Sequence, residues 1–523
     1  MSTTTAQRQI VRAAGIVMAA FVLSNLTGLL RQMLISRAFG TGTDLDALYA
    51  AQRLTDVLFN LVAGGALASA FIPTFTGFLA HDETEGAWRL ASGVLNLVFI
   101  VLLAVSVPAW LLATPLVQIV LAPGFPPAEQ ALAASLLRIV LLAPTIFGVS
   151  GLLMGILNAH QHFLLPALAT SMLWLGMIFG LLVWVPTWGI YGLAWGYVLG
   201  AAMHLLVQVP GVVRLAAARY WPSLGLRNAS VREVIRLMGP RLIGVAAVQI
   251  NFLITTILAS FMTAGSVSSL SYAWQIFTMP QVVIAQGIAI AALPTFSAMV
   301  SRGEINAMRA SLADTLRGIL FLALPATVGL FALRAPVVAM LFQGRNFDAE
   351  STQLVAWALA WFTLGLASHS VVEIVSRAYY ALRDTRTPVI IGTAAMLLNI
   401  GFSFVLALLF ARIGWQPHGG LALANTLATT LEGLGLMWWM RRRLQGLALT
   451  RVWNGLLRTA LASAVMGALL ALWLQDTGGL SPWIVGVGGV VLGGAVFAAT
   501  AYALRVPEAR LLPKMVLERL RRT

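Results

Sequence analysis

Two arginines lie in apolar stretches of the chain where a membrane helix ordinarily carries no charge. Arg31 and Arg53 stand on either side of a short turn rich in Gly, Thr and Asp. An arginine at bilayer depth costs between about 3 and more than 10 kcal/mol, so it normally faces a protein interior or a water-filled cavity. Alternatively, both side chains snorkel to the turn, because each lies within about 10 Å of it at a rise of about 1.5 Å per residue. The first alternative predicts a cavity for an anionic substrate.

A second group of polar side chains occurs further along the chain, again within apolar stretches. His369, Glu373 and Arg377 are spaced four residues apart and therefore share one face of a helix. This face is either a proton relay or gate, or an ion pair that snorkels to the end of its helix. Glu432 has no close basic partner in sequence, which indicates an ion or proton role.

Composition places the chain among membrane proteins and excludes several kinds of site. Of 523 residues, 59% are hydrophobic and 10% are charged, where a soluble domain has about 25% charged residues. Without cysteine there are no disulfides or thiolate metal sites, and with Lys514 as the single lysine there is no nucleotide-binding GxxxxGK[ST] motif. No metal-ligand spacing and no nucleophile–base arrangement is present, so we expect no enzyme activity, no catalytic residues, no metal and no cofactor.

The apolar runs predict an all-α polytopic membrane protein. Runs of about 20 apolar residues are needed to cross the hydrocarbon core. We count fourteen such runs, at about 13–36, 46–79, 88–113, 131–157, 163–185, 189–213, 233–262, 268–299, 309–333, 353–381, 388–411, 419–440, 454–474 and 482–505.

The basic residues predict the orientation of these spans. Alternate loops carry 26 lysines and arginines on the side that holds both termini and four on the other side, with three more inside spans. Because basic loops stay inside, both termini are expected in the cytoplasm. The net charge of +15 therefore indicates topology rather than nucleic-acid binding. Basic clusters in the sixth-to-seventh loop and in the C-terminal tail are further expected to contact anionic lipids.

An internal repeat of about 222 residues divides the chain. Tyr49-Ala50-x-Gln52 recurs as Tyr272-Ala273-x-Gln275, and Ile72-Pro73-Thr74-Phe75 recurs as Leu293-Pro294-Thr295-Phe296. Six helices per copy give both copies the same direction, which predicts two parallel bundles related by an axis along the membrane normal. We expect lobes at 1–222 and 223–445, with two added helices and a basic cytoplasmic tail at 446–523. Spans 1, 2, 7 and 8 would then meet, which adds Asp46 and Gln275 to the candidate substrate-binding residues.

Motifs along the first 440 residues or so resemble the MurJ/MviN family of lipid II flippases, within the superfamily of multidrug and oligosaccharidyl-lipid/polysaccharide exporters. They include G-L-L-R (28–31), A-F-G-T-G-T-D-L-D-A (38–47), G-A-L-A-S-A-F-I-P (65–73), L-F-Q-G-R-N-F (341–347) and A-Y-Y-A-L-R-D-T-R-T-P (378–388). Arg31 matches a basic cavity position of the family, and Arg53 replaces one nearby. The chain departs from the family pattern at Asn25 and Gln32, where a second Arg and an Asp are usual.

The resemblance implies a flippase that moves lipid II from the inner to the outer leaflet of the bacterial plasma membrane by alternating access. Its implied partner is an undecaprenyl-diphosphate-linked glycan, gripped by Arg31 and Arg53 and surrounded by membrane lipids. The departures favour an alternative, an exporter of another polyprenyl-diphosphate-linked glycan or amphiphile. A third alternative is a non-transporting membrane scaffold. Contact with the cell-wall synthesis machinery is left open, and no nucleic-acid partner is expected.

Overall fold

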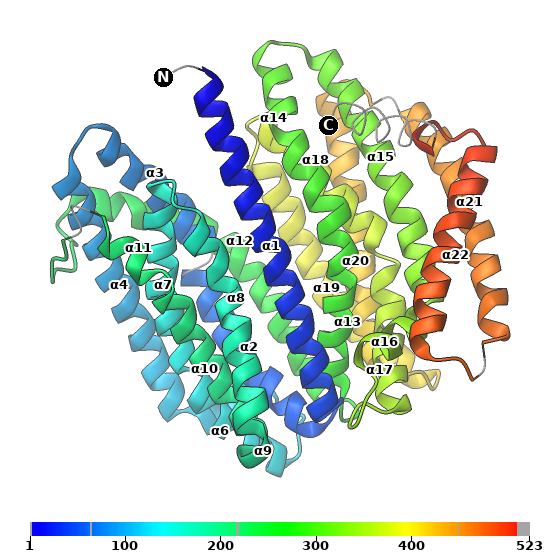
Figure 1. Ribbon diagram of the computed structural model, residues 1–523, viewed down its shortest axis with the longest axis horizontal. Helices are drawn as coiled ribbons and strands as arrows, with labels where there is room; N and C mark the ends of the chain where they lie inside the picture. Colours follow the sequence, from blue (N-terminus) through cyan, green and yellow to red (C-terminus); the bar gives the residue numbers. More distant parts are fainter. Residues whose placement is uncertain (1–2, 63–64, 216–218, 448, 478, 510–523) are drawn as a thin grey trace. The chain divides into compact units, whose positions relative to one another are not determined.

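The computed structural model describes residues 3–62, 65–215, 219–447, 449–477 and 479–509 (Figure 1). These residues form helices joined by short turns; no strand occurs among them, and there is one isolated bridge between Gly344 and Phe347. The all-helical class predicted from the apolar runs is therefore confirmed. Contacts between Cα atoms group the chain into two compact units, Met1–Val267 and Ser268–Thr523.

The first unit contains the helices up to α12. Their bounds are α1 Thr3–Phe39, α2 Thr43–Val62, α3 Gly65–Ala80, α4 Thr84–Leu111, α5 Ala113–Leu116, η1 Val117–Leu121, α6 Pro127–Val140, α7 Leu142–Ala159, α8 Leu164–Phe179, η2 Gly180–Trp184, α9 Val185–Trp188, α10 Ile190–Leu206, α11 Val209–Val213 and α12 Ala229–Ser260. Helix α12 packs against α2 and α3. The predicted lobe boundary at 222/223 follows the repeat, not these contacts, and stays a prediction, as does the boundary at 445/446.

The second unit is built from α13 onward. Its helices are α13 Ser266–Gln281, which begins just before the boundary, η3 Val282–Gln286, α14 Gly287–Ser301, α15 Ile305–Ala332, α16 Arg334–Phe342, α17 Ala349–Thr363, α18 Leu366–Ala381, α19 Arg386–Arg412, α20 His418–Arg443, α21 Leu449–Gln475 and α22 Pro482–Ala503. Phe321 of α15 packs with Met466 of α21 and Phe497 of α22. The two C-terminal helices therefore share a core with α15.

Nine helices in the described part of the chain are long and apolar enough to cross a membrane. The number rises to 11 if each of two bent pairs, Ala229–Gly239 with Gly244–Ser260 and Ala349–Thr363 with Leu366–Ala381, is one span. The other expected spans correspond to α1, to α2 with α3, and to α20. The chain is thus a multi-pass membrane protein, while the count of fourteen stays a prediction.

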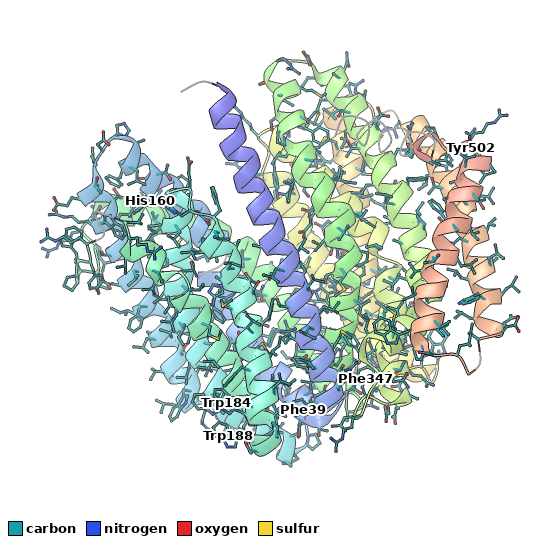
Figure 2. The ribbon with its side chains drawn as sticks, viewed as in Figure 1. Phe39, His160, Trp184, Trp188, Phe347 and Tyr502 are labelled. Carbon is teal, nitrogen blue, oxygen red and sulfur yellow. The ribbon has the colours of Figure 1, made fainter. Side chains whose placement is uncertain are left out.

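Glycines allow two helices of the first unit to pack backbone to backbone. A Cβ added to Gly176 of α8 would lie 2.3 Å from the Cα of Gly200 in α10, and one added to Gly180 would lie 2.5 Å from the Cα of Gly196. Such close approach is typical of membrane helices, where small residues let backbones come together. Near the end of this pair, Trp184 and Trp188 stack with ring centroids 5.8 Å apart (Figure 2).

Candidate functional site

Arg31 lies in α1 and its guanidinium is turned toward α8. The guanidinium carbon is 4.2 Å from the centroid of the Trp174 ring, and Nη1 is 3.6 Å from Sδ of Met177. Gly28, one turn earlier in α1, makes room for this indole, since a Cβ there would lie 3.3 Å from Nε1 of Trp174. The side chain is half-buried. Arg31 therefore contacts residues in the middle of a neighbouring helix.

A short chain of hydrogen bonds connects Arg31 to α2. Nη2 of Arg31 donates to Oε1 of Gln32 at 2.7 Å, and Nε2 of Gln32 donates to Oη of Tyr49 at 3.0 Å. Gln32 is 1% exposed. Because the Gln32 amide is bonded on both sides, it fixes one edge of the guanidinium without neutralising its charge. The neutral glutamine does not itself offset the Arg31 charge, whereas a carboxylate at this position would.

Arg53 lies in α2 and faces α12. Its Nε donates to Oγ1 of Thr256 at 3.1 Å, its guanidinium carbon is 5.4 Å from the Phe252 ring centroid, and Nη1 is 3.8 Å from Oδ2 of Asp56. The side chain is 20% exposed. Arg53 and Asp56 thus pair at i and i+3, but at a long distance. A second cation stands in the first unit, partly offset by a carboxylate.

Asp46 is occupied by a main-chain contact. Its Oδ2 accepts a hydrogen bond from the N–H of Gly265 at 2.7 Å, and the residue is 1% exposed. Gly265 has φ +85°, and a Cβ there would lie 2.4 Å from the carbonyl oxygen of Thr41. The carboxylate therefore satisfies a backbone donor at the start of α13, as acidic groups do at helix N-termini. This contact braces the beginning of α2 against the turn before α13.

Gln275 and the polar residues of α18 and α20 belong to the second unit. Gln275 is half-buried in α13. Nε2 of His369 is 3.1 Å from Oδ1 of Asn425 in α20, and the imidazole lies edge-on to Phe277 with centroids 5.1 Å apart. Glu373 and Arg377 form an ion pair at 2.6 Å. The predicted His–Glu–Arg face is therefore divided between an imidazole held by an amide and a separate ion pair.

Glu432 lies in α20 against α19. A Cβ added to Gly392 of α19 would be 3.2 Å from Oε1 of Glu432. The glycine therefore leaves space for the Glu432 carboxylate. Over the described ranges, Glu432 makes no hydrogen bond or ion pair with another side chain. The role predicted for Glu432 in ion or proton binding stays a prediction.

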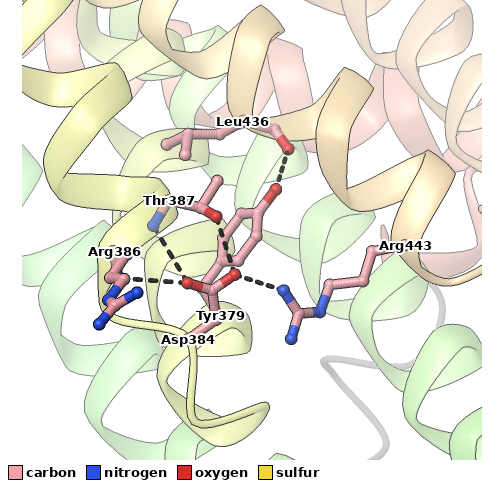
Figure 3. Close-up of polar contacts among 6 residues, drawn as sticks. All are labelled: Tyr379, Asp384, Arg386, Thr387, Leu436 and Arg443. Atoms are coloured by element: carbon pink, nitrogen blue, oxygen red, sulfur yellow. Dashed lines mark hydrogen bonds and ion pairs between the residues drawn. The ribbon is translucent and has the colours of Figure 1, made fainter.

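A polar clamp joins the α18–α19 turn to the end of α20 (Figure 3). Oδ1 of Asp384 accepts from the N–H groups of Arg386 and Thr387 at 3.1 and 3.0 Å, and its Oδ2 accepts from the Thr387 hydroxyl at 2.8 Å and from Arg443. Burial opposes ionisation of Asp384, but the Thr387 hydrogen bonds and the Arg443 charge together hold its pKa below the usual value. No indication of this clamp is visible in the sequence, because Asp384 and Arg443 are 59 positions apart along the chain.

Several contacts of the site carry no sequence signal. Trp174 and Met177 occur in an apolar run that predicts a span and nothing else, and Thr256 is one of many hydroxyls in α12. Tyr49 could have been found, because the repeat already singled it out. Within the residues that the structure describes, no three His, Cys, Asp or Glu side chains gather closely enough to hold a metal ion. The side chain of Arg241 and the basic tail residues Arg510, Lys514, Arg519, Arg521 and Arg522 lie outside the described residues.

Comparison with known proteins identifies the family. The sequence profile of the family described as lipid II flippase MurJ matches residues 35–487. The chain belongs to the lipid II flippase MurJ family. The lipid II flippase MurJ of Burkholderia cenocepacia is 30% identical over 434 residues, which cover 81% of this chain and 82% of that protein. The similarity thus covers most of both proteins.

Solved structures agree with this MurJ fold. A lipid II flippase MurJ in an inward closed conformation superimposes with a TM-score of 0.80 at 23% identity, covering 94% of this chain and 98% of that one. An inward-facing multidrug resistance MATE family transporter of the MOP superfamily gives a TM-score of 0.68 at 16% identity, covering 83% and 98%. The chain described here therefore has the same fold as these two transporters, as the motifs predicted.

Proposed function

We propose that this chain is a flippase that moves lipid II, the lipid-linked peptidoglycan precursor, from the inner to the outer leaflet of the bacterial plasma membrane by alternating access. The family match over residues 35–487 is the observation that carries this proposal. The chain also spans 82% of the length of a curated lipid II flippase. Lipid II and the surrounding membrane lipids are its proposed partners.

Arg31 is the proposed anchor for the diphosphate. Its guanidinium is positioned by Trp174 and Gln32, yet these contacts contribute no negative charge. A planar guanidinium can donate two parallel hydrogen bonds to a phosphate, which gives orientation as well as charge. Fixing the side chain in advance reduces the entropy lost when the substrate binds.

Arg53 is the proposed second contact for the diphosphate, once its guanidinium has left the weak ion pair with Asp56. The 3.8 Å distance to Asp56 leaves that ion pair easy to exchange for a phosphate oxygen. Asp46 has a different proposed role, because its carboxylate already accepts from Gly265 and would repel a diphosphate. We assign it to bracing the turn between α1 and α2. Gln275 stays a proposed substrate-binding residue.

In the second unit, His369 with Glu373 and Arg377 is the proposed gate or proton relay. The Glu373–Arg377 ion pair and the contact of His369 with Asn425 are the polar contacts on which this proposal rests. Glu432 is the proposed ion- or proton-binding residue, because it forms no ion pair within the described part of the chain and a charged side chain inside a span usually marks a functional site.

Both termini are proposed to lie in the cytoplasm, because most arginines stand in the loops on that side. Single cysteines in this cysteine-free chain can test the orientation. A cysteine in place of Ser223 should be labelled from the cytoplasmic side by an impermeant reagent, and one in place of Asp476 from the outer side. Labelling of both from one side would overturn the orientation or the number of spans between them.

Complementation tests the substrate. Expression of the chain should restore growth and cell shape to a bacterium depleted of its own lipid II flippase, whereas Arg31→Ala at matched protein level should not. Purified chain in proteoliposomes should then make fluorescent lipid II accessible from the opposite leaflet. Failure in both assays with correctly inserted protein would overturn the proposal.

An exporter of another polyprenyl-diphosphate-linked glycan or amphiphile is the second candidate. Asn25 and Gln32 favour it, because each removes a charge that the family pattern has. Offering several lipid-linked glycans to the same proteoliposomes distinguishes the two candidates by the glycan that is moved. A chain that moves none of them would instead fit the scaffold alternative.

A further inference from the structure

An apolar pocket of about 230 Å³ lies at one end of the first unit. It is formed by α4, α7, α11 and the segment at Arg219 and Tyr220, with Trp88, Leu95, Leu153, Ile156, Val209 and Val212 among its lining residues. A site for a whole drug-sized ligand occupies about 300–1,000 Å³. The pocket is therefore suited to part of one hydrocarbon chain, with the remainder of the ligand outside.

The wall of this pocket is held in place by hydrogen bonds to α4. Nδ2 of Asn96 donates to the carbonyl oxygens of Trp221 and Ser223 at 3.2 and 2.8 Å. Oη of Tyr220 donates to Oδ1 of Asn96 at 2.7 Å, and the Trp221 N–H donates to Oγ of Ser92 at 3.1 Å. Four hydrogen bonds thus fix the segment that carries Arg219 and closes the pocket.

Two arginines meet one indole at the rim. The guanidinium carbons of Arg219 and Arg89 are 5.4 and 5.8 Å from the Trp221 ring centroid. Arg89 pairs with Glu85 at 2.6 Å, but both side chains are more than half exposed, so the pair is weak. Across the described residues, no carboxylate pairs with Arg219. The rim is therefore cationic where the interior is apolar.

A larger hollow in the same unit lacks this combination. It has about 530 Å³ and is lined by residues of α4, α7 and α10 that include Leu103, Val107, Trp110 and Leu142, with no charged side chain. It provides an internal comparison, an apolar surface without a cationic rim.

We propose that the smaller pocket binds an anionic phospholipid, with one acyl chain in the pocket and the phosphate between Arg89 and Arg219. Guanidinium groups match phosphate geometry, and Tyr220 and Trp221 are the aromatic residues typical of a membrane interface. The pocket lies at the sixth-to-seventh loop, which the arginine distribution assigns to the cytoplasmic side, where anionic lipids are concentrated. The site needs no lipid II and is separate from Arg31.

Brominated lipids can test this site in the full-length protein. A single cysteine replaces Val213, which lines the pocket and is 71% exposed, and carries a bimane label in nanodiscs. Chain-brominated phosphatidylglycerol and phosphatidylcholine are compared as quenchers at equal mole fraction without lipid II. Phosphatidylglycerol should quench preferentially, and Arg219→Gln should lower that preference about fivefold, the effect of about 1 kcal/mol per basic side chain at a membrane surface.

Matched variants separate the pocket from general surface charge. The pair Arg227→Gln and Arg232→Gln removes one exposed arginine of the same loop and one of the first turn of α12, both outside the pocket, and should leave the preference unchanged. Val212→Trp fills the pocket and should abolish the preference with both rim arginines present. A label at Val107 in the larger hollow should report no preference.

Three results would overturn the proposal: equal quenching by the two lipids at position 213, an unchanged preference in Arg219→Gln, or the same loss in the distant arginine pair. Each variant is accepted only when its thermal unfolding midpoint in neutral lipid matches that of the parent chain. Because lipid II is absent, the outcome does not depend on whether the chain is a flippase.

Discussion

The guanidinium carbon of Arg31 lies 4.2 Å from the centroid of the Trp174 ring. A cation over an indole face is attracted by about 0.5–2 kcal/mol, more when water is excluded. The contact joins α1 to α8, 143 residues apart along the chain (174 − 31). The indole and the Gln32 amide both hold the guanidinium in place, and neither group carries a charge of its own.

The shape of the Arg31 side chain should matter as well as its charge. Arg31→Ala should lower the flipping rate about 10- to 100-fold, because a charge-assisted hydrogen bond contributes about 1.5–3 kcal/mol. Arg31→Lys should recover only part of the rate, since an ammonium lacks the bidentate fork. Arg138→Lys, which changes a half-buried arginine of α6 bonded to Thr114, is the control. Wild-type rates for both Arg31 variants in proteoliposomes would contradict a substrate contact.

Loss of the indole should weaken substrate binding without removing the charge. In Trp174→Leu, Arg31 keeps Gln32 but loses the cation–π contact, so the apparent KM for lipid II should rise about two- to thirtyfold. Trp188→Leu, on a tryptophan that is 52% exposed, should leave KM unchanged. A Trp174 variant with altered maximal rate but unaltered KM would argue against a positioning role.

The Asp46 contact should stabilise the first unit. Asp46→Ala leaves the Gly265 N–H without its acceptor and should cost about 1–3 kcal/mol of unfolding free energy, whereas Asp46→Asn keeps an acceptor oxygen and should cost less. Asp44→Ala alters an exposed acid in the same turn of α2 and should have a small effect. Thermal unfolding in detergent measures all three. If Asp46→Ala unfolds at the same temperature as Asp44→Ala, the bracing role is wrong.

A buried polar group couples α7 to α10. Oγ of Ser150 is 2.7 Å from Nδ1 of His204 and also accepts from Nε2 of Gln208 at 2.7 Å. Ser150→Ala leaves both partners buried with a bond missing, at a cost of about 1–3 kcal/mol. Ser171 is equally buried, but its hydroxyl has no hydrogen-bond partner among the residues that the structure describes, so Ser171→Ala should be neutral or stabilising. Equal unfolding midpoints for the two variants would contradict this difference.

The Asp384 clamp should make stability depend on acid. The folded-state pKa of Asp384 is below its usual value, because the Thr387 hydrogen bonds and the Arg443 charge outweigh burial. Its contribution is therefore present above the unfolded pKa of about 3.9 and lost as the pH falls through the lower folded pKa. Asp384→Asn should lower the unfolding midpoint at neutral pH and flatten its decline in acid. Asp476→Asn, at an exposed site, should preserve the decline; a decline unchanged in Asp384→Asn would exclude the clamp as its cause.

Local features of the sequence were sufficient for the helical class, and local signals mark some individual helix ends. Apolar runs specify a membrane helix because each backbone polar group must be satisfied within its own segment in lipid. Gly40, with φ +60°, directly follows the end of α1, and the Asp348 side chain accepts from the Ser351 N–H at the start of α17. Such signals act over a few residues, so they can be read without knowing the fold.

The sequence also indicated which residues to suspect. Arg31, Arg53 and Glu432 are conspicuous in the sequence because a charged side chain within a membrane span raises the free energy of the folded protein in any orientation. The family motifs predicted the superfamily fold because their order along the chain reflects one arrangement of helices. Neither argument says which neighbour a charge meets.

Tertiary packing decided the partners. Asp46 meets Gly265, 219 residues further on, and Arg31 meets an indole whose apolar surroundings gave no hint of a polar role. α12 packs on α2 and α3, although the repeat assigns it to the second lobe. The physical reason is that the free energy lost on burying a charged or polar side chain depends on that residue alone and can be read from the sequence. The hydrogen bonds and ion pairs that offset this loss depend on which distant side chains the packed helices bring within about 3–4 Å.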